Sequence, residues 1–189
     1  MPAKNDFIVD PKLLDLNRPI VTLEGIRKLN LQRFEFEQLS GILYEDVDQR
    51  VCAGYLKTSE DDYWVRGHMP GMPLMPGVLM LESVAQLASF FTQRHDLLGA
   101  EIVGFGGVDG VRFRGVVLPG DTLILLMKLS KVRRGRMIIA DFQGLVDNKL
   151  VVDGTIRGIP LPVQGVKEFL AEKSIDKQPA DGPTQTVND

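Results

Sequence analysis

Residues 76–94 constrain the fold of this chain more than any other segment. From Val78 to Phe91 the side chains are apolar around most of the circumference of a helix, which predicts a helix surrounded by protein. Pro76 is suited to begin that helix, because its ring presets the helical φ and its missing N–H costs nothing in the first turn. The apolar run falls short of the roughly 20 residues that cross a bilayer, so we expect a buried helix.

Four polar residues interrupt this helix at steps of four, three and four, which places them on one stripe: Glu82, Gln86, Ser89 and Gln93. A polar partner is expected to face the stripe. An unpaired carboxylate at Glu82 would cost several kcal/mol or would take up a proton. Glu82 is therefore a candidate proton donor, and the alternative is an ion pair with Arg112 or Arg114.

The helix follows a segment in which three prolines and three glycines occur between Gly67 and Gly77, a pattern that excludes regular structure and predicts a rigid loop. We expect His68 at the end of a strand just before this loop, with its ring held above the helix start. The other histidine, His95, closes the helix, where an imidazolium is favoured by the helix dipole, so a structural role is expected for it.

The helix start itself is a candidate oxyanion site. Its first N–H groups point outward with the positive end of the dipole, and Gly77 allows close approach of a ligand oxygen such as a thioester carbonyl. A base, an acid and an oxyanion site are what elimination of water β to a carbonyl requires. His68, Glu82 and Gly77 supply these three functions.

The remaining pattern predicts an α+β fold in which an antiparallel sheet wraps the central helix. A short helix is expected near residues 23–30 and another at 166–173, before a disordered tail. Turn signals and alternating patterns predict strands, the first two joined as a hairpin, at 41–47, 50–57, 101–105, 107–113, 121–130, 136–146 and 149–159. The expected organisation is an extension at 1–20, a domain at 21–160 and a tail at 161–189.

Composition excludes several classes of partner. A formal net charge of −3 gives no general attraction for nucleic acid or for an anionic membrane. The single cysteine, Cys52, cannot form an internal disulfide, and the first ten residues contain no apolar run of signal-peptide length, so we expect a cytoplasmic protein. One local basic cluster occurs near a predicted hairpin turn, at Lys128, Lys131, Arg133, Arg134 and Arg136.

Three blocks resemble the (3R)-hydroxyacyl-acyl-carrier-protein dehydratases of bacterial fatty acid synthesis. They are GHMPGMPLMPGVLMLESVAQ at 67–86, VDGVRFRGVVLPGDTL at 108–123, and the run RRGRMIIADFQGLVDNKLVVDG. The first is highly specific, because the paired PG turns, the histidine and the glutamate occur at the family's spacing. The resemblance covers roughly residues 22–158 and implies a hot-dog fold, in which a curled antiparallel sheet wraps one long helix.

The resemblance also implies a homodimer, or a trimer of dimers, with sites shared between subunits. By analogy, His68 of one subunit removes the α-proton of a 3-hydroxyacyl thioester, and Glu82 of the other handles the leaving hydroxyl. The Gly77 amide would hold the thioester oxygen, and Gln86 would support the carboxylate. No metal or other cofactor is implied. An acyl tunnel beside the helix would be lined by residues such as Val78, Leu79 and Phe105.

The partner implied is acyl carrier protein, which is strongly acidic. The basic cluster around Lys131, Arg133, Arg134 and Arg136 is one candidate docking patch, with a solvated hairpin turn as the alternative, and Arg112 and Arg114 are rivals for the role.

The chain departs from the family pattern at Met72, where arginine is frequent, at Gly104, where an aromatic gate residue is frequent, and in the segment NLQRFEF at 30–36. The alternative functions are a non-catalytic acyl-carrier-binding subunit and a hot-dog thioesterase.

Overall fold

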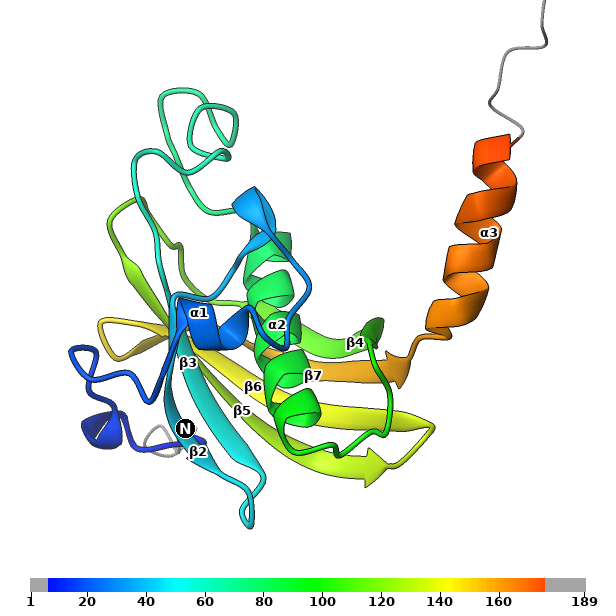
Figure 1. Cartoon of the computed structure of the whole chain (residues 1–189). Helices are drawn as coiled ribbons and strands as arrows, with labels where there is room; N and C mark the ends of the chain where they lie inside the picture. The colour runs from blue at the N-terminus through cyan, green and yellow to red at the C-terminus, as the bar shows by residue number, and fades with distance from the viewer. Residues whose placement is uncertain (1–6, 176–189) are drawn as a thin grey trace, which may run out of the picture.

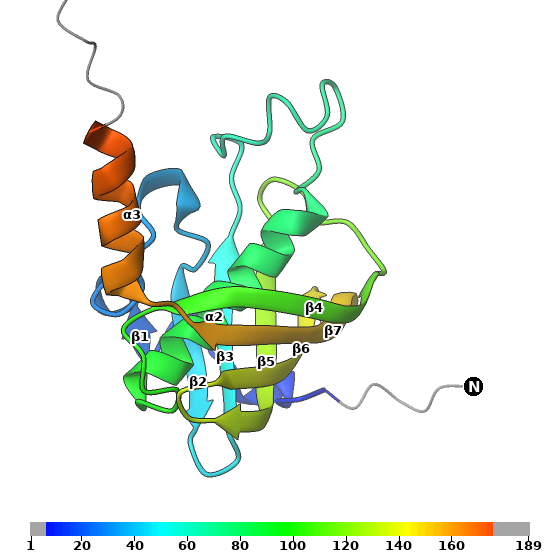
Figure 2. The same cartoon turned by 90° about the vertical axis from the view of Figure 1, so that its right-hand side faces the viewer.

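A computed structural model describes residues 7–175, with side chains described through residue 171. A seven-stranded antiparallel sheet curls around one long helix, α2 (Gly77–Arg94), as Figures 1 and 2 show from two sides. This is the expected hot-dog architecture. The polypeptide after residue 175, where a disordered tail was predicted, lies outside the described residues.

The sheet has the strand order β1-β2-β3-β5-β6-β7-β4. Its strands, in chain order, are β1 (Val21–Thr22), β2 (Gly41–Asp46), β3 (Val51–Lys57), β4 (Val103–Phe113), β5 (Thr122–Arg133), β6 (Met137–Val146) and β7 (Lys149–Pro160). The predicted hairpin of the first two long strands is confirmed by the pairing of β2 with β3. Strand β4 pairs with β7 and forms one end of the sheet.

Two sequence expectations about strands were wrong. The two short strands expected at 101–105 and 107–113 are one strand, β4, whose register with β7 shifts between Phe105 and Gly107. Such a bulge lets a strand continue past a glycine-rich stretch that looks like a break in the sequence. Residues 64–68 form turns rather than a strand, so His68 lies within the loop and not at a strand end.

Helix α2 is buried because its apolar surface meets the concave face of the sheet. Leu87, Phe90 and Phe91 are fully buried and belong to one core cluster with Leu123, Leu125 and Ile138 of the sheet. Burial of each such side chain stabilises the fold by about 1.5–3 kcal/mol. The predicted protein-surrounded helix is confirmed over these positions, while Val78 in its first turn is 70% exposed.

The described part of the N-terminal extension, residues 7–20, includes one turn of 3-10 helix at Pro11–Leu13 and packs on the outer face of the sheet. Val9 is buried in a second apolar cluster with Val51, Ala53 and Leu126, and the N–H of Ile8 donates to the side-chain carbonyl of Gln143 at 2.9 Å. The extension therefore covers apolar surface on the side of the sheet opposite to α2.

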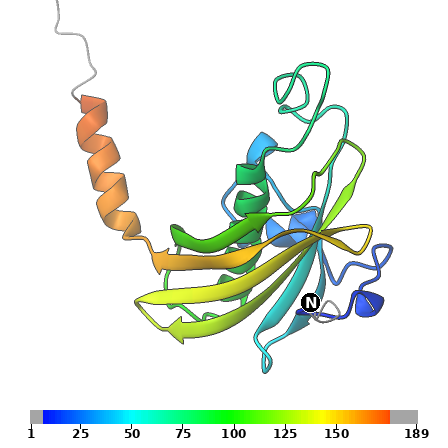
Figure 3. The ribbon, with the colours of Figure 1, turned by 180° about the vertical axis from the view of Figure 1, so that it is seen from behind.

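Two smaller helices complete the fold. Helix α1 (Leu23–Ile26) lies within the range predicted for it, and α3 (Val163–Ile175) begins earlier than the expected residue 166. Figures 2 and 3 show α3 standing away from the sheet at the end of β7. Within residues 7–175, no helix is both long and apolar enough to cross a membrane.

Candidate active site

The loop that carries His68 is held by reciprocal backbone hydrogen bonds. The N–H of Leu74 donates to the carbonyl of His68 at 2.8 Å, and Met69 and Met72 each donate an N–H to the other's carbonyl. The N–H of Met75 donates to the carbonyl of Val117 at 2.8 Å, which ties the loop to the segment after β4. The expected rigid loop is thus present, and it rises beyond the N-terminal end of α2 (Figure 1).

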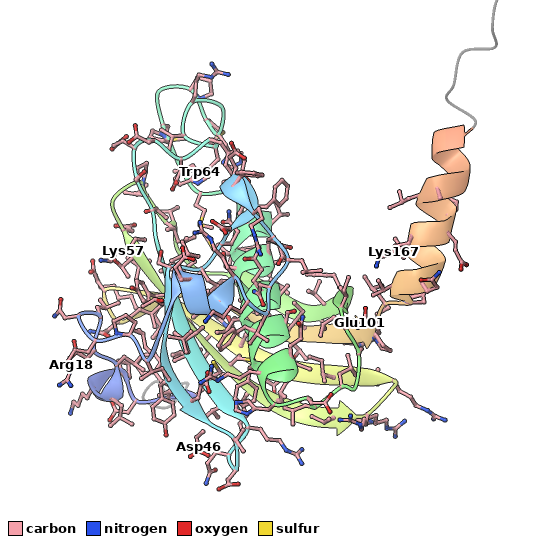
Figure 4. The ribbon with its side chains drawn as sticks, in the orientation of Figure 1. Arg18, Asp46, Lys57, Trp64, Glu101 and Lys167 are labelled. Carbon is pink, nitrogen blue, oxygen red and sulfur yellow. The ribbon has the colours of Figure 1, made fainter. Side chains whose placement is uncertain are left out.

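The imidazole of His68 is oriented by its own loop. Nδ1 lies 2.8 Å from the carbonyl oxygen of Leu74, and a carbonyl oxygen can only accept a hydrogen bond. The neutral ring must therefore carry its proton on Nδ1, which leaves the lone pair of Nε2 available. His68 is exposed, so that lone pair is accessible from outside the chain. Trp64, whose carbonyl accepts from the N–H of His68, is buried beneath this loop (Figure 4).

The start of α2 lies against an aromatic ring. A Cβ added to Gly77 would fall 2.7 Å from Cε1 and 2.9 Å from Cζ of Phe113, so this ring occupies the space that the missing side chain leaves. The N–H groups of Gly77 and Val78 lie in the first turn of α2. Backbone N–H groups in the first turn of a helix have no carbonyl partner within that helix. Pro76 is the N-cap, and its side chain makes no capping hydrogen bond.

Glu82 is oriented by the next turn of α2. Nε2 of Gln86 donates to Oε1 of Glu82 at 2.8 Å and also to the carbonyl of Phe36 at 2.7 Å. Oε1 of Gln86 accepts from the N–H of Gln38 at 2.9 Å. Because the Gln38 N–H can only donate, the amide of Gln86 cannot be turned over, and its NH₂ group must face Glu82.

Segment 30–38 supplies the polar surface that was expected to face the stripe on α2. Asn30 is 3% exposed, and its Nδ2 donates to the backbone carbonyl of Gln86 at 3.0 Å. Farther along the stripe, Nε2 of Gln93 donates to Oγ of Ser89. The contributions of Asn30, Phe36 and Gln38 were missed at the sequence level, since two of them act through backbone atoms that any residue type provides.

Tyr63 lies on the chain just before His68, in a partly buried and acidic environment. Burial first, and then the negative charges of Asp62, Glu82 and Glu35, raise the pKa of Tyr63.

Among the described residues, Glu82 forms no ion pair with either Arg112 or Arg114, the alternative partners. Arg114 instead binds Asp153, with Nε 2.5 Å from Oδ1, and this contact raises the pKa of Arg114. His95 has the structural environment expected for it: Nε2 lies 3.3 Å from Oε2 of Glu45, and the ring contacts Phe91 edge-on.

A pocket lies between α2 and the strands β4, β6 and β7. It is a small, partly open hollow of about 20 Å³ and is apolar except for one arginine; we call it the α2–β7 pocket, and its lining is Ala85, Ala88, Val103, Gly104, Phe105, Ile138, Ile156, Arg157 and Gly158. Of the residues expected to line an acyl tunnel, Phe105 contributes to this pocket. Val78 is mostly exposed, and Leu79 packs against the core.

The candidate docking residues fall at two separate places. Arg112 and Arg114 flank Phe113, whose ring contacts the start of α2. The hairpin turn with Lys131, Arg133, Arg134 and Arg136 lies at the other end of the helix, because Arg134 pairs with Asp96 and the N–H of Gly135 donates to the carbonyl of Leu98. The 18 residues of α2 separate these two places by about 27 Å.

Comparison with known proteins identifies relatives over most of the chain. Residues 31–155 match the family model described as a FabA-like domain. The 3-hydroxyacyl-[acyl-carrier-protein] dehydratase FabZ of Desulfotalea psychrophila is 36% identical over 139 residues, which cover 72% of this chain and 91% of that protein. The FabZ of Mannheimia succiniciproducens is also 36% identical, over 74% of this chain and 90% of its own length.

Solved structures share the fold at low sequence identity. A chain of the dehydratase heterocomplex ApeI:P from Xenorhabdus doucetiae superposes with a TM-score of 0.65 at 12% identity, covering 81% of this chain and 99% of that one. Cj0977, a sigma28-regulated virulence protein of Campylobacter jejuni, gives a TM-score of 0.54 at 14% identity, over 77% and 96% of the two chains. These likenesses establish the arrangement of sheet and helix.

Proposed function

Since the chain belongs to the FabA-like family, we propose that it is a hydro-lyase that removes water from a 3-hydroxyacyl thioester on acyl carrier protein. The product is a trans-2-enoyl thioester, and the pathway is the synthesis of fatty acids or related lipids. The curated relatives named as FabZ dehydratases support this assignment. The observation in the structure that carries it is the 2.8 Å contact between Nδ1 of His68 and the carbonyl oxygen of Leu74, which assigns the proton to Nδ1 and leaves Nε2 to take a proton.

In the proposed reaction, Nε2 of His68 removes the proton at C2 of the acyl group. Negative charge collects on the thioester oxygen, where the N–H of Gly77 and the positive end of the α2 dipole stabilise it. Glu82, protonated on Oε2, donates that proton to the 3-hydroxyl, and the C3–O bond breaks to release water. Gln86 donates to Oε1 of Glu82, so Oε1 serves as the acceptor and Oε2 remains for the proton.

We include a homodimer in the proposal, with His68 and Glu82 of one site drawn from different subunits. Strand β4 supports this, because it forms one end of the sheet over 11 residues and carries exposed Phe105, Val108 and Phe113. A long edge strand with exposed apolar side chains favours pairing with another strand. A solution molar mass equal to that of one chain would contradict a shared site. So would heterodimers of an inactive His68 variant and an inactive Glu82 variant that regain no activity.

Carrier docking near the start of α2 is favoured over docking at the hairpin. Arg112 is exposed and is adjacent to Phe113, which contacts Gly77, whereas the hairpin lies at the far end of the helix. Arg112→Glu is expected to raise the KM for an acyl-carrier substrate about tenfold, with the KM for a coenzyme A thioester little changed. The matched control is Arg133→Glu at the hairpin.

The proposal also includes a cytoplasmic location. The single cysteine, Cys52, is fully buried, and burial raises its pKa, which suits a protein without disulfide chemistry.

The reaction is tested by following hydration of a crotonyl thioester in the ultraviolet, which is dehydration run in reverse. His68→Ala and Glu82→Gln are each expected to lower kcat by about 10²- to 10⁴-fold, the usual contribution of a positioned acid or base. His95→Ala and Glu101→Gln are the matched controls, since both positions lie outside the proposed site. Release of free thiol would indicate a thioesterase instead, and no turnover in either assay would favour a carrier-binding subunit.

A further inference from the structure

Gln86 is held by both ends of one short segment. At the first end, Nδ2 of Asn30 donates to the backbone carbonyl of Gln86 at 3.0 Å. At the second end, the carbonyl of Phe36 and the N–H of Gln38 bind the Gln86 side chain at 2.7 and 2.9 Å. We call residues 27–38 the Gln86 loop, and Figure 1 shows this loop following α1 and lying beside α2.

Arg33 lies in the middle of the Gln86 loop and binds main-chain carbonyls. Nη1 donates to the carbonyl of Asn30 at 2.8 Å and to that of Gln32 at 2.6 Å, and Nη2 donates to the carbonyl of Arg27 at 2.9 Å. Arg27 is the C-cap of α1, so the guanidinium joins the loop to a helix end. Within residues 7–171, Arg33 forms no salt bridge. Its hydrogen bonds therefore serve the shape of the loop.

The backbone next to Arg33 is strained. Phe34 has a φ of 59°, a left-handed conformation that is unfavourable for a bulky side chain. Its ring is 84% exposed, so burial of the ring does not compensate for the strain. Strained backbone persists only where the surrounding structure imposes it, and it is often found at functional sites. The bonds of Arg33 on one side of Phe34 and of Phe36 on the other are placed to impose it.

We propose that Arg33 is a positioning residue for the dehydration, which keeps the Glu82 carboxyl oriented by holding the Gln86 loop in the shape that binds Gln86. This inference rests on the proposed function. Arg33 fixes the loop, the loop fixes Gln86, and the Gln86 amide binds Oε1 of Glu82. Because Arg33 touches no reacting atom in this role, its loss should lower kcat and leave KM nearly unchanged.

The first test measures hydration of a crotonyl thioester by variants of the full-length chain. Arg33→Ala is expected to lower kcat about three- to tenfold, the usual worth of one hydrogen bond. Arg33→Lys keeps the charge but replaces the planar fork with a single nitrogen, so it should lose nearly as much. Arg18→Ala, at an exposed arginine that Figure 4 places away from α2, is the control. Full activity in Arg33→Lys, or a raised KM with unchanged kcat, would overturn the proposal.

A double-mutant cycle tests whether Arg33 acts through Gln86. In Gln86→Leu the connection to Glu82 is already broken, so adding Arg33→Ala should lower kcat by less than about twofold more. If the two losses instead multiply, Arg33 acts by another route and the proposal is wrong. Urea unfolding of each variant ensures that the rates being compared are those of folded protein.

Hydrogen exchange at Gln86 separates failure of this inference from failure of the proposed function. The side-chain NH₂ of Gln86 donates to both Glu82 and Phe36, and its exchange with solvent can be followed by nitrogen-15 NMR without turnover. Arg33→Ala should speed this exchange about tenfold or more, because the loop opens more often. The side-chain NH₂ of Gln93, which binds Ser89, is the internal control.

The exchange result decides between the two claims. Faster exchange at Gln86 in a chain that dehydrates no substrate would uphold the role of Arg33 in orienting Gln86 and contradict the proposed function. Unchanged exchange in Arg33→Ala would overturn the inference, whatever the activity of the variant.

Discussion

The side-chain amide of Gln86 links Glu82 to the backbone of segment 36–38: it donates 2.8 Å to Oε1 of Glu82 and 2.7 Å to the carbonyl of Phe36, and it accepts from the N–H of Gln38. Gln86 is 2% exposed, and its bond to the N–H of Gln38 is buried, while the bonds to Glu82 and Phe36 are partly buried. The carboxyl group at the centre of the proposed chemistry is thus oriented by a residue whose own orientation is fixed by the main chain.

Replacement of Gln86 by leucine should affect stability and catalysis together. The buried N–H of Gln38 would lose its acceptor, at a cost of about 1–3 kcal/mol, and the carbonyl of the exposed Phe36 would lose its donor. Urea unfolding should show a lower free energy of unfolding. The kcat should fall about tenfold or more, because Glu82 is no longer oriented. Gln93→Leu, which removes only the bond to Ser89 farther along α2, is the control. Unchanged kcat in a folded Gln86→Leu variant would show that Glu82 needs no such support.

The tautomer of His68 can be observed directly. The bond between Nδ1 and the carbonyl of Leu74 predicts that the neutral imidazole is protonated on Nδ1 and unprotonated on Nε2. Nitrogen-15 chemical shifts of the two nitrogens of the neutral ring distinguish the two forms. His95→Gln assigns the signals, as the chain has two histidines. The opposite tautomer would remove Nε2 of His68 as the proposed base.

Gly77→Ala tests the contact between the start of α2 and Phe113. The added methyl group would lie 2.7 Å from the ring, so either the ring or the helix start must shift, at a cost of about 1–3 kcal/mol. A lower melting temperature and a reduced rate are expected. Because alanine keeps its N–H, adding Phe113→Leu should recover much of the stability. If the double variant is no more stable than Gly77→Ala alone, the ring is not the cause.

The ion pair between Arg27 and Glu37 predicts a defined dependence of stability on pH. Nε of Arg27 lies 2.6 Å from Oε1 of Glu37, and hydrogen bonding to Arg27 lowers the pKa of Glu37 in the folded chain. A folded pKa below the unfolded one means that the pair stabilises the fold above the unfolded value, about 4.3, and that this contribution is lost as the pH falls through the folded value.

Glu37→Gln should therefore lower the free energy of unfolding at pH 7 and flatten its decline on the acid side. Glu24→Gln is the matched control, since Glu24 also binds Arg27 but its side chain is 76% exposed. Denaturant unfolding at pH 7 and at about pH 3 measures both variants. Parallel pH profiles for Glu37→Gln and the unaltered chain would contradict the assignment.

Much of the fold was predictable, for reasons that lie in local pattern. The apolar circumference of 78–91 predicted a helix surrounded by protein, and turn residues marked the connections of β5, β6 and β7. A break between two strands was expected at Gly106, because sequence pattern cannot show that the register with β7 shifts and the strand goes on. His68 was expected at the end of a strand, although the backbone bonds of the loop select turns.

The sequence by itself determined which chemistry is available and where the helix begins: His68, Glu82 and Gln86 are set by residue type and by spacing along one helix face. Only the tertiary structure decided how these groups are held, because their partners are the carbonyls of Leu74 and Phe36 and the N–H of Gln38. Backbone atoms are the same at every position, so no residue type marks them.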